Sequence, residues 1–328
     1  MEKFINKEIL GTAKYILTKF VEILSKYYFV FIGLFFLHKA LHLISYPSIS
    51  LTSKIYVCMF VLICFTAYKD IRQDIKLIPF LISCFIFFMF VFFINKHGYQ
   101  FWGKMLRWQM RKSIIVNLNP IFRSIPFNDG SFTRIYKSET LTWFFRMVYN
   151  NGFVLPVMLA IYRSALIKDF GKMIRYALSA HILQVFLITP FYLVFHLQEV
   201  WYVLGQPDGL NRHLTPHAAA GITLNCFPSM HTSICFAMFL LVLKENSRIF
   251  KVVYGFFCLS VIYSTLYLEI HWVLDIIGGM VLAYVTVKLS GFILDKLKML
   301  LEKPLNIFYY KNVKTIYVNN YYLYTMKN

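Results

Sequence analysis

Acidic residues are scarce in this chain of 328 residues, where 15 Asp and Glu stand against 34 Lys and Arg, a formal net charge of +19. Charged residues of both signs make up only 15% of the chain, whereas hydrophobic residues make up 59%. Soluble domains carry about 25% charged residues, so this composition excludes an ordinary water-soluble fold. The positive charge is spread over many short segments without a nucleic-acid-binding motif, and no nucleic-acid partner is expected.

Cysteine and glycine are also too sparsely placed to indicate a familiar site. Five of the six cysteines stand in apolar stretches and are expected to be packing residues. Cys226 stands in a polar segment without an obvious partner, so no structural disulfide is expected. The sequence has no Cys/His pattern with metal-ligand spacing, no glycine-rich phosphate loop and no internal repeat. It therefore predicts neither a metal nor a cofactor.

Long apolar runs recur along the chain, and each is long enough, or nearly so, to cross a bilayer. We place them at about 27–46, 51–68, 77–95, 140–162, 176–197, 229–243, 251–268 and 272–292. The first is expected to act as an uncleaved signal. The prediction is an all-α polytopic membrane bundle of about eight transmembrane helices, with a catalytic core of five to six helices.

Lys and Arg in the short connections indicate the orientation of the bundle. They concentrate in segments 1–26, 69–76, 163–175 and 244–251 and in the tail after 292, which are therefore predicted to be cytoplasmic together with both termini. Segments 47–50, 96–139 and 198–228 then face the outside or the lumen. Segment 96–139 carries eight Lys or Arg, but long segments contribute little to this rule.

Four parts follow from this pattern. Residues 1–95 form an N-terminal three-helix membrane unit, and 140–292 form the core. Residues 96–139 form an interfacial amphipathic segment: Lys104, Arg107 and Arg111 share one helical face, and Phe101, Met105 and Trp108 share another. This segment either simply rests on the membrane or gathers an anionic lipid. Residues 293–328 form a basic cytoplasmic tail, partly disordered or interface-bound.

Two histidines and one carboxylate stand at the ends of successive apolar runs. His231 follows Pro228 and Ser229, and His271 lies 40 residues later (271 minus 231), about one helical hairpin. Both histidines should therefore return to the same membrane face. Asp275 lies four residues after His271, on one face of a helix, where a carboxylate can orient an imidazole and raise its basicity. The pattern suits a histidine nucleophile with a second histidine as acid, although each motif alone is more often structural, with Ser229 a helix cap.

These residues resemble the motifs of the type 2 phosphatidic acid phosphatase superfamily, Pro-Ser-Gly-His and Ser-Arg-x5-His-x3-Asp. Here Met230 replaces the glycine and Thr265 the arginine. The departures are more similar to the inositol phosphorylceramide and sphingomyelin synthase branch. The resemblance implies an integral-membrane enzyme that cleaves a lipid phosphoester through a phosphohistidine on His271, with Asp275 activating it and His231 as acid and base.

Positive charge for the phosphate has two candidate sources on the same predicted side. Arg212 stands 19 residues before His231, and Arg146 lies near the start of an apolar run with Asn150 one turn beyond. Each could instead snorkel or pair structurally. Ser229 and the first turn of its helix are also predicted to contact phosphate. Lys168 and Arg175 match the superfamily's first motif literally, but the run 176–197 separates them from His231, so we assign them to the cytoplasmic face.

The sequence predicts a lipid phosphatase if water is the acceptor, or a head-group phosphotransferase if a lipid hydroxyl is. Its partners are a lipid phosphate or phospholipid and the bilayer. A non-catalytic lipid binder or flippase is the alternative, but it has no need for the histidine pair. A channel or transporter would spread polar residues along several spans, whereas here they gather near one face.

Overall fold

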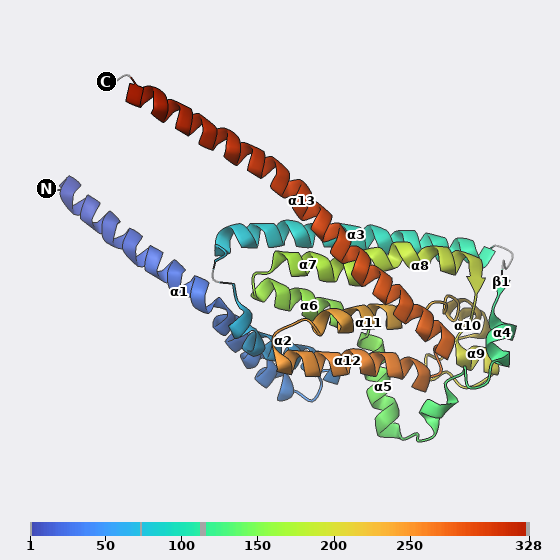
Figure 1. Cartoon of the computed structure of the whole chain (residues 1–328). Coiled ribbons are helices and arrows are strands. Elements are labelled where there is room, and N and C mark those ends of the chain that lie inside the picture. The colour runs from blue at the N-terminus through green and yellow to red at the C-terminus, as the bar shows by residue number, and fades with distance from the viewer. Residues whose placement is uncertain (1, 73, 112–115, 326–328) are drawn as a thin grey trace. The chain divides into compact units, whose positions relative to one another are not determined.

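The computed structural model describes residues 2–72, 74–111 and 116–325, and it confirms an all-α membrane fold. The chain divides into two compact units, Met1–Val287 and Lys288–Asn328. The helices, drawn in Figure 1, are α1 Glu2–Ile44, α2 Leu51–Ala67, α3 Leu77–Arg111, α4 Asn119–Ser124, α5 Glu139–Asn151, α6 Leu155–Leu166, α7 Phe170–Ala177, α8 Leu183–Val194, α9 Val200–Leu204, α10 Pro216–Ile222, α11 Met230–Val242, α12 Arg248–Tyr267 and α13 Val273–Thr325.

Short irregular elements link these helices. A π-helical stretch, Leu178–Ile182, joins α7 to α8, and 3-10 turns cover Tyr68–Asp70 and Ser131–Arg134. The strands of the described residues, β1 Val116–Asn117 and β2 Phe195–His196, form a two-residue parallel pair with Val116 opposite Phe195.

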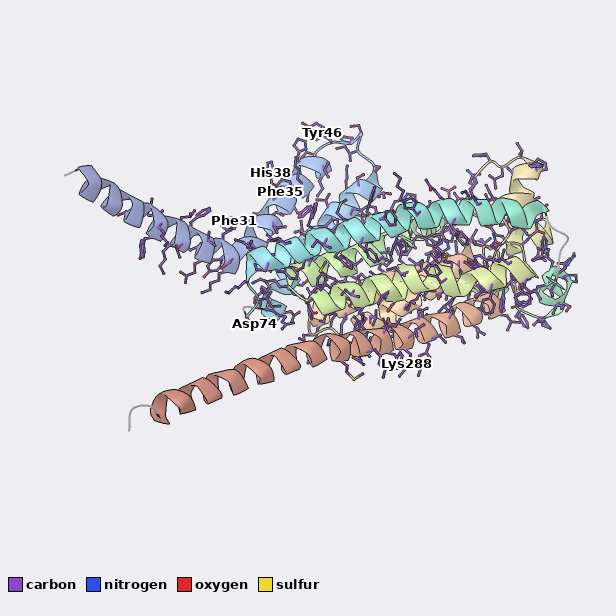
Figure 2. All side chains as sticks on the ribbon, turned by 90° about the horizontal axis from the view of Figure 1, so that it is seen from above. Phe31, Phe35, His38, Tyr46, Asp74 and Lys288 are labelled. Atoms are coloured by element: carbon purple, nitrogen blue, oxygen red, sulfur yellow. The ribbon has the colours of Figure 1, made fainter. Side chains whose placement is uncertain are left out.

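Among the described residues, five helical segments are long and apolar enough to cross a membrane, or six if the bent pair α5–α6 is one span. α2 and α11 are shorter apolar helices, so each of the eight predicted runs falls on a mainly helical apolar segment, although 140–162 is divided between two helices. Large apolar side chains such as Phe31 and Phe35 of α1 are exposed (Figure 2), as expected where hydrocarbon replaces water as the solvent. The chain is a multi-pass membrane protein.

The core of the first unit forms where α11 packs against α12, α6 and the π-helical stretch (Figure 1). Viewed from above, α3 runs beside α7 and α8 (Figure 2). Gln184 of α8 links three elements: its Nε2 donates to Thr286 Oγ1 of α13 at 3.1 Å, and its Oε1 accepts from Ser233 Oγ of α11 at 2.6 Å. These bonds satisfy polar groups that lipid could not.

The loops of the first unit gather at two ends of the bundle. At one end, which we call the Glu245 end, Glu245 accepts from Lys172 Nζ at 2.8 Å and lies near Arg163, which also pairs with Asp70. Arg163 is buried and its guanidinium lies 4.5 Å from the Phe250 ring centre. Lys168 belongs to this end, because its Nζ donates to the Ile75 carbonyl at 3.2 Å.

The other end, the His231 end, unites segment 116–138, the connection 195–229 and the start of α13. Trp201 N–H donates to the Glu269 carbonyl at 2.9 Å, and Leu118 N–H donates to the His196 carbonyl at 2.9 Å. The 13 residues of α11 separate the two ends by about 20 Å of helix. The predicted cytoplasmic connections 69–76, 163–175 and 244–251 thus lie at the Glu245 end. The predicted outer segments that the structure describes around the site, 116–138 and 195–229, lie at the His231 end.

Three predicted boundaries differ from the helices observed. α3 continues to Arg111 rather than ending at 95, so the amphipathic stretch prolongs a membrane helix. The side chains of Met105, Arg107, Trp108 and Arg111 lie outside the described residues. The predicted run 140–162 is broken into α5 and α6, which meet at 59°. α13 continues through the second unit to Thr325, since Leu, Lys, Met and Glu favour helix even where no apolar face repeats.

Candidate active site

His271 and Asp275 meet at the start of α13. Asp275 Oδ2 lies 3.2 Å from His271 Nδ1 and accepts the Trp272 N–H at 3.0 Å. Asp275 is fully buried and His271 is 5% exposed. A carboxylate in the first turn of a helix satisfies free N–H groups and interacts favourably with the helix dipole. With Nδ1–H donated to Asp275, Nε2 of His271 keeps its lone pair, which is the form a nucleophile requires.

Asn128 fixes the first turn of the same helix from a distant segment. Its carbonyl accepts from Val273 N–H at 2.8 Å, and its Oδ1 accepts from Leu274 N–H at 2.9 Å. Its Nδ2 donates to the Phe122 carbonyl at 2.9 Å. Asn128 therefore caps α13 across the fold. Sequence analysis missed this, because the chain around Asn128 carries no motif that relates it to residue 273.

Ser229 begins α11 as the helix cap that its position suggests. Its Oγ accepts from Thr232 N–H at 3.3 Å, and its own N–H donates to the Asp275 carbonyl at 3.0 Å. Gly279 permits this approach, because a Cβ there would lie 2.6 Å from the Ser229 carbonyl oxygen. The start of α11 is thereby held against the start of α13.

This contact brings the two predicted histidines together. The ring centres of His231 and His271 lie 6.1 Å apart, with the planes inclined at 60°. His231 is 7% exposed and stacks on Tyr149 of α5 at 4.2 Å, with Phe153 at 3.7 Å. Phe153 lies at the bend between α5 and α6, so that bend wraps two aromatic rings around His231. The two imidazoles are therefore close enough to act on one phosphoryl group.

Arg212 is engaged by carboxylates at the same end of the bundle. Its Nη1 donates to Glu199 Oε1 at 3.1 Å, its Nη2 also pairs with Glu199, and its Nε donates to Asp208 Oδ2 at 2.8 Å. Its guanidinium lies 5.6 Å from the Trp201 ring centre. Burial opposes ionisation of Asp208, but hydrogen bonds from Arg212 lower the pKa of that carboxyl below its ordinary value. The guanidinium of Arg212 is thus held in place, and Glu199 and Asp208 accept from its N–H groups.

The other predicted phosphate contacts differ in their surroundings. Arg146 is partly buried and its Nε donates to the Gly209 carbonyl at 2.7 Å, which ties α5 to the loop that carries Arg212. Asn150 is exposed, and its side chain makes no hydrogen bond with the described residues. The structure therefore brings Arg146 and Arg212 to one loop and leaves Asn150 at the periphery.

A second apolar cluster lies beside the site and includes Trp272, the residue that follows His271. Cys226, Trp272, Phe122, Leu197 and Val200 are buried together. Trp272 Nε1 donates to the Gln198 carbonyl at 2.9 Å. The thiol of Cys226, which the sequence left without a partner, lies within 4.8 Å of a donor atom of both His271 and Asp275. Its position depends on contacts that spacing does not indicate.

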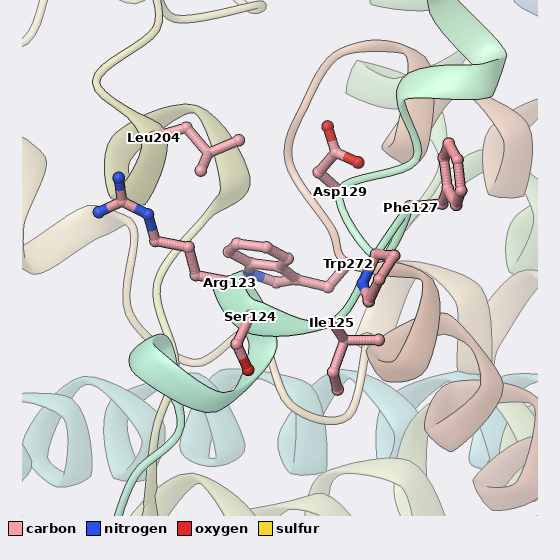
Figure 3. Close-up of a pocket in the computed structure, with 8 residues that line it drawn as sticks. Arg123, Ser124, Ile125, Phe127, Asp129, Leu204 and Trp272 are labelled. Carbon is pink, nitrogen blue, oxygen red and sulfur yellow. The ribbon is translucent and has the colours of Figure 1, made fainter.

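A cavity of about 280 Å³ opens beside Trp272 (Figure 3). Arg123, Ser124, Phe127, Asp129 and Leu204 help to line it. Asp129 pairs with Arg134 at 3.0 Å, whereas Arg123 forms no ion pair with the described residues. The cavity thus offers a free cation next to the residue that follows His271.

A comparison with known protein families matches the part of the chain that contains His231, His271 and Asp275. Residues 185–296 match the family model of the PAP2 superfamily. This region includes most of α8, both histidines, Asp275 and Arg212. No curated protein and no solved structure matches the chain. The match and the apolar helices together indicate a membrane phosphatase or phosphotransferase.

Proposed function

We propose that the protein is an integral-membrane lipid phosphatase or head-group phosphotransferase that works through a phosphohistidine intermediate. The observation that carries this proposal is the arrangement of His231, His271 and Asp275. A buried carboxylate lies against Nδ1 of one histidine, and a second histidine lies 6.1 Å away, ring centre to ring centre. A lipid binder or flippase, the alternative, does not require this pair.

In the first step, His271 Nε2 attacks phosphorus and the bond between phosphorus and the lipid oxygen breaks. His231, protonated, gives its proton to that leaving oxygen. Asp275 stabilises the positive charge that develops on the His271 ring through Nδ1–H. The product of this step is a phosphohistidine or a substituted phosphohistidine together with the free lipid alcohol.

In the second step, neutral His231 takes a proton from the acceptor hydroxyl, whose oxygen attacks phosphorus and releases His271. Water as acceptor gives hydrolysis, whereas a lipid hydroxyl gives transfer of the head group. Met230 and Thr265, where the superfamily has glycine and arginine, are similar to the synthase-like branch and make transfer to a lipid hydroxyl an option beside hydrolysis.

Positive charge on the non-reacting oxygens comes from Arg212, with Arg146 supporting the same loop. The substrate phosphate takes over the Arg212 donors that Glu199 and Asp208 hold in its absence. Ser229 and the first N–H groups of α11 add hydrogen bonds, as helix N-termini do for anions. The His231 end faces the outside or the lumen, as the distribution of Lys and Arg predicts.

Trapping of the intermediate tests the proposal. Purified protein is mixed with labelled lipid phosphates and phospholipids, with and without diacylglycerol or ceramide, and quenched rapidly under alkaline conditions. Acid-labile label on the wild-type chain, absent from His271→Ala, is the expected result. Release of free phosphate or formation of a new phospholipid then identifies the acceptor. Equal turnover by wild type and His271→Ala would refute His271 as the nucleophile and with it the phosphohistidine mechanism.

A further inference from the structure

Cys226, His271 and Asp275 form a compact set of metal-binding donors. One thiol, one imidazole nitrogen and one carboxylate oxygen lie within 4.8 Å of one another, and all three residues are buried. Within the ranges that the structure describes, no other group of three His, Cys, Asp or Glu side chains is placed in this way. The proposed reaction uses His271 and Asp275, but it assigns no role to the Cys226 thiol.

An unsatisfied oxygen in this cluster points independently to a ligand. Oδ2 of Asp275 has two hydrogen-bond contacts, from Trp272 N–H and His271 Nδ1. Oδ1 is buried and has no hydrogen-bond partner among the described residues. A buried carboxylate oxygen without a partner is costly, because it has lost water and gained nothing in exchange. A cation bound at this oxygen would satisfy it.

We propose that Cys226, His271 and Asp275 bind a thiophilic divalent cation, Zn²⁺ or Cd²⁺, which inhibits the enzyme. One sulfur, one nitrogen and one oxygen ligand suit Zn²⁺, with a fourth position left for water. Mg²⁺ and Ca²⁺ prefer oxygen ligands and have little affinity for a thiolate. Binding releases the Cys226 thiol proton to solvent, and the sulfur becomes a thiolate ligand.

The inhibitory effect, which rests on the proposed function, follows from the histidine tautomer. The metal takes Nδ1 of His271, the nitrogen that faces Asp275. The proton of the neutral ring must then sit on Nε2, where it occupies the lone pair that attacks phosphorus. The metal also withdraws Asp275 from its hydrogen bond with the ring. The site therefore traps His271 in its non-nucleophilic form.

Metal binding is measured first, without reference to activity. Detergent-purified full-length protein is titrated with Cd²⁺, and the ultraviolet thiolate-to-cadmium charge-transfer band is recorded. Wild type and Cys58→Ser should develop the band equally, because Cys58 is an exposed thiol outside the cluster. Cys226→Ser should lose it. Asp275→Asn should weaken Cd²⁺ affinity by about tenfold or more, since even the loss of an outer-shell partner costs that much.

Inhibition is measured second, with Zn²⁺ and with Mg²⁺ as the control ion. Cys226→Ser should raise the Zn²⁺ concentration for half-inhibition by about tenfold or more, while Cys58→Ser should leave it unchanged. If Cys226→Ser does not fold, Cys226→Ala replaces it in both measurements. A band that persists without Cys226, or no band in wild type, overturns the metal site. If the band depends on Cys226 but the protein turns over no lipid phosphate, the metal site is supported and the proposed lipid phosphatase or phosphotransferase activity is contradicted.

Discussion

His231 has surroundings that separate its role from that of His271. His271 is tied to a carboxylate, whereas His231 lies against the Tyr149 and Phe153 rings, which offer it no charge. A histidine without a fixed acceptor can carry its proton to a reacting oxygen and recover it. The two environments support our proposal that His271 is the nucleophile and that His231 carries the mobile proton.

His231→Ala should lower turnover of a lipid phosphate strongly, but much less for a nitrophenyl phosphoester, whose leaving group needs no proton. We expect loss of about 10²–10⁴-fold with the lipid, the usual contribution of a general acid. The measurement compares kcat for both substrates in wild type, His231→Ala and His271→Ala. Equal losses with both substrates in His231→Ala would contradict the assignment.

Arg212→Ala should lower kcat/KM by about 10²-fold, the usual cost of one donor to a charged transition state. Two carboxylates, Glu199 and Asp208, position its guanidinium, so the loss should exceed that of a surface cation. Lys168→Ala is the control, since Lys168 lies at the Glu245 end and contacts the Ile75 carbonyl. If Lys168→Ala is the inactive variant and Arg212→Ala is not, the phosphate contact has been assigned to the wrong end.

At the scale of elements, two helix starts meet and a distant segment caps one of them. Ser229 N–H bonds to the Asp275 carbonyl, and Asn128 satisfies the first N–H groups of α13. The distance between His231 and His271 is thus set by backbone contacts rather than by their own side chains. The close approach of α11 and α13 depends on Gly279, which has no side chain to separate the two helix starts.

Gly279→Ala should reduce turnover sharply and lower the midpoint of thermal unfolding. A Cβ there would meet backbone, the Ser229 carbonyl oxygen at 2.6 Å, so α11 must shift, and overpacking of this kind costs about 1–3 kcal/mol. Gly255→Ala is the matched control, because its Cβ would meet only the Phe239 ring at 3.4 Å, an ordinary contact. Comparable behaviour of the two variants would show that the crossing is not tight.

At the scale of the molecule, the loops divide between the Glu245 end and the His231 end. Buried ion pairs such as Arg163 with Asp70 hold the first end together, and the site occupies the second. The Lys and Arg of the short connections 69–76, 163–175 and 244–251 lie at the Glu245 end, and we therefore predict that this end faces the cytoplasm.

Labelling of single introduced cysteines tests this orientation. Gln206→Cys at the His231 end should react with an impermeant maleimide on intact cells or sealed luminal-side-out vesicles, whereas Asn246→Cys should react only after permeabilisation. Both positions are exposed, and the parent chain with its native cysteines gives the background. If Asn246→Cys reacts on the intact membrane and Gln206→Cys does not, the predicted orientation is wrong and the opposite one holds.

The sequence alone determined the membrane class, the apolar runs and the meeting of His231 with His271. Hydrophobic run length reports helices directly, and two residues one helical hairpin apart must return to the same face. The aromatic rings on His231, the cap from Asn128 and the carboxylates on Arg212 were decided only by the tertiary structure. So was the thiol of Cys226 beside Asp275. Each of these depends on contacts between segments far apart in the chain. Sequence spacing alone does not distinguish a residue that only packs in the core from one that contacts the site.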